Sequence, residues 1–320
     1  MATNLSVVIP SHQRIDLLHA CLESVTRHAP SGTEVLVVDD ASPGGAVTAC
    51  AAGFARVRVL RLPRRRGFCG AANAGIHAAV HSIVELLNDD TEVTAGWAES
   101  PLAAFADLTV GAVAPLVLYW PGGEVGAARV DSAGDRYYRG GIAGKRGHGQ
   151  TLTSTHLRRE KVFGASGSCA FYRRAALLEV GGFPESFGAY FEDVDLSFRL
   201  HWAGFEVVYE PASRVLHHVG ASYGRPDRRL QQQQARNEER VFWRNLPGRE
   251  LVRALPAHLA VIAAKAWRRW RAGELGPFLR GRLEVLGETA ALRQHRRRLR
   301  YFRAPSTAAN WRLERHFWEI

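Results

Sequence analysis

The residues best suited to chemistry lie in one acidic segment, residues 191–199, which reads FEDVDLSFR. In a helix, Asp195 and Arg199 are four residues apart and can form an ion pair, which gives them a structural role. Glu192 and Asp193 then lie at the N-terminal end, where unpaired N–H groups and the helix dipole favour negative charge. The segment alone also fits an ordinary charged helix start, so other motifs must decide.

Two further acidic pairs follow short apolar runs. Asp39 and Asp40 come directly after residues 34–38, and Asn88-Asp89-Asp90 comes after residues 83–87. Short apolar runs that end in turn residues are typical of buried parallel strands. Because open α/β sheets bind ligands at the carboxyl ends of their strands, these carboxylates are candidates for a ligand site.

An alternation of strands and helices must position these carboxylates. We expect strands at residues 5–10, 34–39, 57–62, 83–87, 111–118 and 168–172, and helices at 14–28, 47–55, 69–81, 97–107 and 174–180. The alternation predicts an α/β fold with a doubly wound, mostly parallel sheet flanked by helices. Residues 120–159 are rich in Gly, Arg and Tyr and show little periodicity, so we expect a long functional loop or an irregular excursion there.

The composition is that of a globular protein without a disulfide framework. The chain has 320 residues, 46% of them hydrophobic, enough for one large domain and an appendage. Its four cysteines are widely spaced and form no CxxC pair, which argues against zinc and for a reducing compartment. The apolar run at residues 5–9 is too short for a signal peptide, and no run approaches the ~18 apolar residues of a membrane span. We therefore expect a cytoplasmic protein.

The charge is distributed unevenly along the chain. Residues 223–320 carry 22 basic and 9 acidic residues, a net charge of +13, whereas residues 1–222 carry 20 and 22, a net charge of −2. The whole basic excess is therefore C-terminal. We expect a catalytic or ligand-binding domain at 1–222 and a basic, mainly helical region at 223–320.

Seven motifs in order make the chain resemble the family 2 glycosyltransferases of GT-A fold, and in pattern their bacterial rhamnosyltransferase-like members. The resemblance covers roughly residues 4 to 222. The motifs are VVIPSHQR at 7–14, VVDDAS at 37–42, GFCGAANAG at 67–75, LNDD at 87–90, GGFPESF at 181–187, FEDVDLSFRL at 191–200 and VLHHVGAS at 215–222. The resemblance implies a Rossmann-like GT-A sheet and transfer of a sugar from a nucleoside diphosphate sugar.

The resemblance implies a divalent cation, Mg²⁺ or Mn²⁺, held against the diphosphate. Negative charge grows on that leaving group in the transition state, and a hard cation prefers carboxylate, phosphate and water oxygens. Asp90 matches the position that touches the metal, and Asp89 matches a position nearer the ribose or sugar. His217 matches a histidine that completes the metal site in some relatives, although the adjacent His218 is an alternative. The structural alternative for Asn88-Asp89-Asp90 is an Asx turn that closes the strand, and the alternative for His217 is a core or surface histidine.

The resemblance also implies a set of nucleotide contacts. Asp40 matches the residue that hydrogen-bonds the base, and Pro10, Ser11 and Arg14 would form the loop beneath it. Asn73 matches the next element, whose small residues would let a helix approach the nucleotide. Alternatively, Asp40 caps the following turn and the glycine-rich segment around Asn73 serves packing alone, since its spacing is weak evidence by itself.

Inversion at the anomeric carbon requires a base for the acceptor hydroxyl. By resemblance that base is Asp193, with Glu192 orienting or contacting the acceptor. A carboxylate of ordinary pKa is a weak base for an alcohol, so proton transfer would be late and assisted by orientation.

Two departures from the family pattern concern the donor. Arg64-Arg65-Arg66 stands where an Asn-containing turn is common, and Pro184 stands where Asp is usual. The arginines would either add a diphosphate contact or form a solvated basic turn. The proline weakens any donor assignment that depends on that Asp.

The C-terminal region contains a basic amphipathic pattern. Leu255, Leu259, Ile262, Ala266 and Trp270 recur at helical spacing and are flanked by Arg253, Lys265, Arg268, Arg269 and Arg271. Such a helix suits an anionic membrane surface, and the alternative is a helix packed on the catalytic domain with an arginine-rich outer face. Residues 295–303 mix cations with aromatics and raise a rival class, a non-catalytic nucleic-acid- or membrane-binding protein on a GT-A scaffold. The carboxylates and metal-ligand candidates argue against that rival, so we expect no nucleic-acid partner.

The sequence thus predicts an inverting, metal-dependent glycosyltransferase of cell-surface polysaccharide synthesis. The donor expected by analogy is dTDP-rhamnose, and a hexosyl or galactofuranosyl transferase using a UDP-sugar is the alternative. The expected acceptor is a glycan or lipid-linked glycan at the cytoplasmic face of the membrane, which the protein would contact peripherally. The linkage and the oligomeric state stay open.

Overall fold

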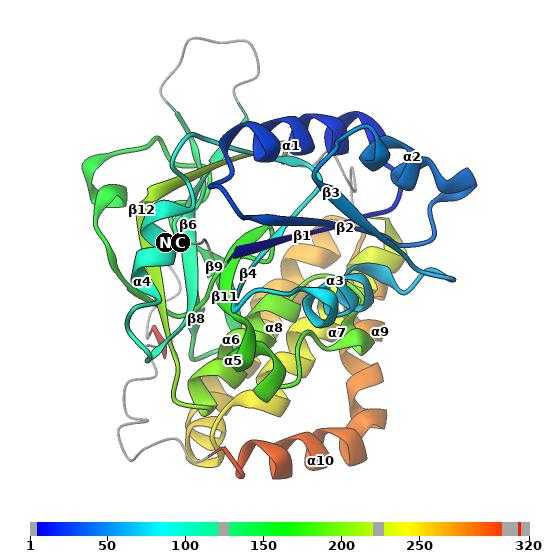
Figure 1. Ribbon diagram of the computed structural model, residues 1–320. Coiled ribbons are helices and arrows are strands. Elements are labelled where there is room, and N and C mark those ends of the chain that lie inside the picture. Colours follow the sequence, from blue (N-terminus) through cyan, green and yellow to red (C-terminus); the bar gives the residue numbers. More distant parts are fainter. Residues whose placement is uncertain (1–4, 121–127, 220–226, 303–312, 315–320) are drawn as a thin grey trace.

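The computed structural model describes residues 5–120, 128–219, 227–302 and 313–314. A large sheet with the strand order β10-β12-β6-β11-β4-β1-β2-β3 forms its centre, with β5 added to β12 and β7 added to β6 (Figure 1). Its strands are β1 Leu5–Ser11, β2 Glu34–Asp39, β3 Val57–Arg61, β4 Ile83–Leu87, β5 Thr91–Val93, β6 Val110–Tyr119, β7 Val130–Ser132, β10 Glu160–Val162, β11 Cys169–Arg173 and β12 Glu206–His217. A smaller sheet contains β8 Asp135–Tyr138, β9 Ile142–Lys145 and β13 Leu313–Glu314.

The large sheet is parallel in its N-terminal half and mixed beyond it. β4, β1, β2 and β3 are mutually parallel, as the alternation of strands and helices predicts. β11 runs antiparallel to both β4 and β6, whereas β12 is again parallel to β6. The sheet is therefore mixed rather than mostly parallel, because the chain enters β11 from the long excursion after β6 and not from a βαβ crossover.

Helices cover both faces of the sheet, which accordingly has two hydrophobic cores. The helices are α1 Ile15–His28, α2 Ala46–Ala52, α3 Gly67–Ala78, α4 Glu99–Ala104, α5 Arg174–Glu179, α6 Glu192–Trp202, α7 Arg228–Asn245, α8 Gly248–Arg271, α9 Leu275–Glu284 and α10 Thr289–Leu299. Along β1, Val7 packs in the core with α1 and α2, and its neighbour Val8 packs in the opposite core with α3. α3 lies close to the strands at Gly75, since a Cβ there would overlap the side chains of Val8 and Val38.

Residues 120–159 contain strands where a long loop was expected. β7 pairs with β6, and β8 and β9 form a hairpin in which Asp135 is opposite Lys145. Gly141, with φ +91°, allows the tight turn of this hairpin. The expectation was wrong because these strands are short and carry buried charged residues, so they show no alternation of apolar and polar side chains.

The C-terminal helices pack against the sheet domain, next to α6 (yellow to red in Figure 1). Phe242 of α7 and Ala254 of α8 are fully buried in the core that also contains α3 and α6. Within the helices, Arg282 of α9 forms buried ion pairs with Glu238 and Glu239 of α7. The boundary expected at residue 222 lies outside the described residues. Across the part of the chain that the structure describes, none of the helices combines the length and apolarity needed to cross a bilayer.

Candidate active site

The carboxyl ends of β1, β4 and β12 bring several predicted site residues together. Ser11, at the end of β1, donates a hydrogen bond of 2.6 Å from its hydroxyl to Asp89, which follows β4. Burial raises the pKa of Asp89 to about 7, although the Ser11 hydroxyl and the Arg14 charge oppose the shift. His217, the last residue of β12, lies with its Nε2 3.3 Å from Oδ1 of Asp90. Residues far apart in sequence therefore form one polar site at this edge of the sheet.

Of the two adjacent histidines, His217 is the one directed at Asp90. The ring of His218 stacks on Trp120, with centroids 4.5 Å apart, and its Nε2 lies 3.0 Å from Glu92. Asp90 and His217 are a carboxylate and an imidazole, which suit Mg²⁺ or Mn²⁺ when phosphate and water oxygens supply the other ligands. No cluster of three or more His, Cys, Asp or Glu ligands occurs among the residues described. The pair therefore fits a cation that is held jointly with a phosphorylated ligand.

A third residue at this position, Asp131 of β7, was not expected from the sequence. Its fully buried carboxylate lies 3.0 Å from Nδ1 of His217 and 2.9 Å from Nζ of Lys145. Burial alone would raise the pKa of Asp131, but His148, His217 and Lys145 together hold it well below its usual range. Burial would likewise lower the pKa of His217, yet Asp131 and Asp90 raise it to about 9. Without a cation, His217 is an imidazolium between two carboxylates.

The catalytic candidates Glu192 and Asp193 form the first turn of α6. The two residues before them, Tyr190 and Phe191, have φ values of +69° and +68°, a left-handed conformation that is strained for side chains of this size. Asn237 of α7 holds this turn, because its buried Nδ2 donates a 3.0 Å hydrogen bond to the carbonyl of Tyr190. A residue of the C-terminal region thus fixes the entry to the acidic helix.

The two carboxyls of this turn have different environments. Asp193 accepts hydrogen bonds from the N–H groups of Gly167 (2.9 Å) and Val194 (2.8 Å). Glu192 is buried, and its Oε2 has no hydrogen-bond partner among the described residues. Burial together with the charge of Asp193 raises the pKa of Glu192 well above the usual range. Glu192 is therefore the neutral member of the pair.

Asp195 has the structural role that its spacing predicts. Its carboxylate pairs with Nε of Arg199 at 2.8 Å, which confirms the expected ion pair. It also accepts a 2.7 Å hydrogen bond from Asn245 and lies 3.1 Å from Nε of Arg244, both in α7. These contacts hold the helix that carries Glu192 and Asp193 against α7.

A short link joins the acidic helix to the end of β4. Gly167 donates to Asp193, and the next residue, Ser168, accepts a 2.8 Å hydrogen bond from the N–H of Asn88. Asn88 is two residues before Asp90. The candidate base and the candidate metal ligand are therefore held by neighbouring residues of one segment.

The expected nucleotide contacts are only partly brought together. Asp40 accepts hydrogen bonds from the N–H groups of Arg66 (2.6 Å) and Gly67 (2.8 Å) at the start of α3. It does not cap the turn that follows β2, as the alternative interpretation proposed, because there Asp39 accepts the N–H of Ser42 (2.7 Å). A carboxylate has further lone pairs, so this contact leaves room for another donor. Pro10 lies in β1 opposite Val38, and Arg14 pairs with Asp16 at 3.3 Å just before α1.

Asn73 is buried, and both of its polar atoms are hydrogen-bonded within the fold. Its Nδ2 donates to the carbonyl of Phe183 and its Oδ1 accepts from the N–H of Phe183, both at 2.8 Å. The side chain therefore joins α3 to the turn before α6, and the packing interpretation fits it. In the basic turn, Arg66 pairs with Glu185 at 2.6 Å.

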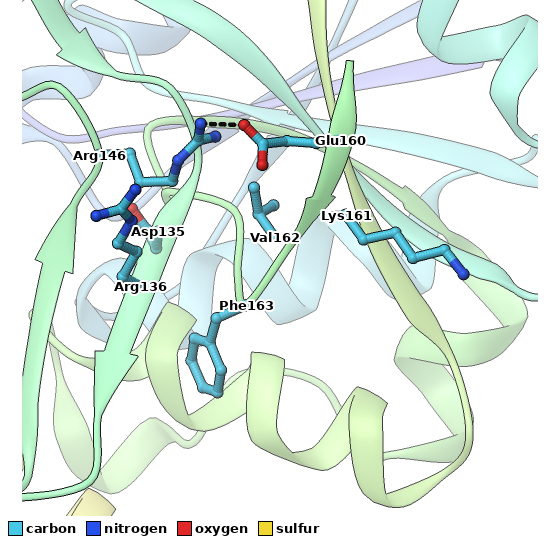
Figure 2. Close-up of a pocket in the computed structure, with 7 residues that line it drawn as sticks. All are labelled: Asp135, Arg136, Arg146, Glu160, Lys161, Val162 and Phe163. Carbon is cyan, nitrogen blue, oxygen red and sulfur yellow. Dashed lines mark hydrogen bonds and ion pairs between the residues drawn. The ribbon is translucent and has the colours of Figure 1, made fainter. Parts of the chain in front are cut away.

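Asp135 of β8 is another charged residue that the sequence did not single out. Burial, and the nearby charge of Asp193, raise its pKa to about 8, and among the described residues its Oδ1 has no hydrogen-bond partner. Figure 2 shows a small hollow beside it, where an ion pair between Arg146 and Glu160 joins the β8–β9 hairpin to β10. Neither this hollow nor the one lined by residues Thr155 to Glu160 includes Asp90, Asp193 or His217.

The comparison with protein families decides the family of the chain. Residues 6–181, more than half of the chain, match glycosyl transferase family 2. The chain belongs to this family. The matched residues include Asp90 at the end of β4 and stop before the acidic helix α6, which lies within the glycosyltransferase domain expected at residues 1–222.

Two relatives from Mycobacterium tuberculosis illustrate the similarity. The chain is 31% identical over 215 residues to a pre-mycofactocin glycosyltransferase, covering 67% of this chain and 42% of that protein. It is 30% identical over 246 residues to N-acetylglucosaminyl-diphospho-decaprenol L-rhamnosyltransferase, covering 70% of this chain and 79% of that protein. The chain thus spans less than half the length of the first relative.

The fold is shared with solved glycosyltransferase structures. The mannosyltransferase PcManGT from Pyrobaculum calidifontis, in complex with GDP-Man and Mn²⁺, matches with a TM-score of 0.56 and 19% identity, over 97% of this chain and 88% of that one. This agreement includes the C-terminal helices and confirms the GT-A fold expected from the motifs.

Proposed function

We propose that the chain catalyses inverting transfer of a sugar from a nucleoside diphosphate sugar to a hydroxyl of a glycan or lipid-linked glycan. The observation that carries the proposal is the link through Gly167 and Ser168. It holds the carboxylate Asp193 beside the strand end that bears Asp90. A base for the acceptor and a ligand for the diphosphate-bound cation are both needed for this reaction, and here one segment supports both.

The chemistry follows from the states of these groups. Asp90 and His217 would hold Mg²⁺ or Mn²⁺, whose charge offsets the negative charge that grows on the leaving diphosphate. Asp193 would accept the proton of the acceptor hydroxyl as the bond to the anomeric carbon forms. Glu192, neutral because of burial, would orient the acceptor through its O–H or carbonyl oxygen. Asp89, with Ser11, would face the ribose or sugar.

The donor in this proposal is dTDP-rhamnose, and a UDP-hexose or UDP-galactofuranose is the alternative. Similarity to a rhamnosyltransferase over most of that protein's length supports the first. Thermal-shift screening against dTDP-, UDP- and GDP-sugars, each with Mn²⁺ and with EDTA, tests both donor and metal. We expect a metal-dependent increase in Tm with one nucleotide class. No shift with any of them would contradict the proposed donor site.

We also propose that the chain contacts an anionic membrane surface through α8. The helix packs on the protein through Ala254, His258 and Val261, and a different stripe of apolar side chains faces outward. The exposed fractions are 73% for Val252, 58% for Leu259, 61% for Trp267 and 58% for Trp270. Exposed Arg271, four residues after Trp267, extends this face with positive charge. An apolar stripe with tryptophans next to an arginine complements the interface of an anionic bilayer, where a lipid-linked acceptor would lie.

Vesicle co-sedimentation tests this surface. The wild type should bind vesicles of phosphatidylcholine with phosphatidylglycerol more tightly than phosphatidylcholine alone, and Trp267→Ala/Trp270→Ala should weaken binding about tenfold or more. Leu108→Ala, another exposed apolar residue but far from α8 in sequence, is the matched control. Equal binding by the double variant and the wild type would contradict the membrane assignment. Loss of a concentration-dependent dimer in the double variant would instead identify α8 as a contact between two copies.

A further inference from the structure

The buried carboxylate of Asp131 has no direct part in the reaction proposed above. It comes from β7, in the segment where the sequence suggested a long loop or an irregular excursion. β7 and β12 flank β6 on opposite sides, with Val117 opposite Ser132 and Tyr119 opposite His217. Asp131 therefore reaches His217 across the end of one strand, at the site edge of the sheet.

The contact involves the nitrogen of His217 that faces away from Asp90. Nδ1 lies 3.0 Å from Oδ2 of Asp131, while Nε2 lies 3.3 Å from Oδ1 of Asp90. A carboxylate accepts hydrogen bonds only, so it requires the hydrogen on Nδ1. The ring is then oriented with its other nitrogen, Nε2, toward Asp90. The lone pair of Nε2 becomes available to a cation that replaces the proton on this nitrogen.

Asp131 is itself held rigidly. Lys145 Nζ lies 2.9 Å and 3.1 Å from the two oxygens of Asp131. The backbone of Lys145 is fixed in the β8–β9 hairpin, where it lies opposite Asp135 in the strand register. His148 Nδ1 lies 3.2 Å from Oδ1 of Asp131. With Lys145 on one side and histidines on the others, the carboxylate cannot turn away from His217, and its charge is balanced by Lys145.

We propose that Asp131 is a positioning residue that fixes His217 as a ligand of the divalent cation through Nε2. The proposal rests on the proposed function, because it needs the cation that Asp90 and His217 would hold. Carboxylates that accept the second N–H of a ligating histidine set its ring orientation and raise its basicity as a ligand. A purely structural ion pair between Asp131 and Lys145 would stabilise the hairpin without affecting metal ligation.

Electron paramagnetic resonance of Mn²⁺ separates these two roles. The probe is Mn²⁺ with dTDP, and in parallel Mn²⁺ with UDP, bound to the full chain. Coordination by a histidine nitrogen gives ¹⁴N modulation of the Mn²⁺ echo, which does not depend on turnover. We expect modulation in the wild type, its loss in His217→Ala, and its retention in His218→Ala, whose ring faces Glu92 instead.

The decisive variants change Asp131. We expect Asp131→Ala to lower Mn²⁺ affinity about 10- to 100-fold and to remove most of the ¹⁴N modulation. Asp131→Asn keeps the volume and one acceptor oxygen, so this variant serves as the test if the alanine variant does not fold. Its affinity for Mn²⁺ should lie between those of the wild type and Asp131→Ala. Modulation and Mn²⁺ affinity unchanged in both variants would show that Asp131 is only structural, while the metal site would stand. A wild type without ¹⁴N modulation would overturn this proposal, and one that binds no Mn²⁺ would overturn the metal step of the proposed function as well.

Discussion

The neighbouring carboxyls Glu192 and Asp193 allow one test of the mechanism by paired isosteric substitutions. Asp193→Asn removes the only candidate base of the first turn of α6, whereas Glu192→Gln replaces a neutral acid by a neutral amide. Both variants keep side-chain volume. The structure therefore predicts a large loss of activity from one change and a small loss from a chemically similar change at the adjacent position.

The expected magnitudes follow from the contacts. Loss of a general base reduces kcat by about 10²- to 10⁴-fold. In Asp193→Asn, the amide oxygen can still accept from Gly167 at the position of Oδ2, so one of two hydrogen bonds is retained. Glu192→Gln loses at most one neutral hydrogen bond to the acceptor, about 1 kcal/mol, which corresponds to roughly fivefold in rate.

The assay measures release of the nucleoside diphosphate from the donor selected by the thermal-shift screen, together with the donor Kd by calorimetry. For Asp193→Asn we expect the loss in kcat while the donor Kd stays within about twofold, because a base acts in the chemical step and not in nucleotide binding. A Glu192→Gln variant that loses as much activity as Asp193→Asn would refute the assignment. Equal loss of donor binding and turnover in Asp193→Asn would refute it too.

Three further predictions concern the metal, the core and the entry to α6. Asp90→Ala should weaken donor binding in Mn²⁺ about tenfold or more but leave binding in EDTA unchanged, as measured by calorimetry. Glu85 is fully buried against Trp97, and burial raises its pKa to about 8, so its carboxyl is protonated in the folded protein. In the unfolded chain this carboxyl ionises above about pH 4.5. The stability of the wild type should therefore fall as pH rises from about 4.5 to 8. The decrease in the free energy of unfolding is at most roughly 1.4 kcal/mol for each pH unit. Glu85→Gln cannot ionise at this position, so its free energy of unfolding in urea should lack this decrease. The difference in stability between the variant and the wild type should therefore be larger at about pH 8 than at about pH 5. Asn237→Ala should destabilise the protein by about 1–3 kcal/mol and lower kcat, because the carbonyl of Tyr190 loses the Asn237 donor and the carbonyls of Phe187 and Ala189 keep only Gln233 as a side-chain donor. Urea unfolding and the release assay would measure the two effects.

The sequence was informative wherever chemistry and periodicity coincide. The apolar runs before Asp40 and Asp90 predict strands with carboxylates at their ends, and the structure has β2 and β4 there. The four-residue spacing of Asp195 and Arg199 predicts their ion pair. Both inferences depend on local pattern, which a single sequence contains in full.

Residues that act across long sequence distances were out of reach. Asp131 lies 86 residues before His217, and the two meet only because β7 and β12 both pair with β6. Lys145 reaches Asp131 through a hairpin whose strands are too short to show a period. The ligand contact suggested by the motif of Asn73 stays a prediction, and the tertiary bonds of both its polar atoms to Phe183 were not visible in the sequence either. In each case a tertiary contact decides the role of the side chain.

The basic C-terminal region, expected as an appendage, is part of what makes the acidic helix usable. A left-handed Tyr190 and Phe191 are unfavourable by themselves, and donors from α7 are needed to hold the turn that precedes Glu192. The first turn of the same helix is also held by Asn245 and Arg244, which bind Asp195. The region therefore has two sides with different tasks. One side of the helical region fixes the geometry of Asp193, and the apolar stripe of α8 is exposed. If the proposed membrane contact of this stripe holds, membrane contact and catalysis would be coupled through a single packed unit.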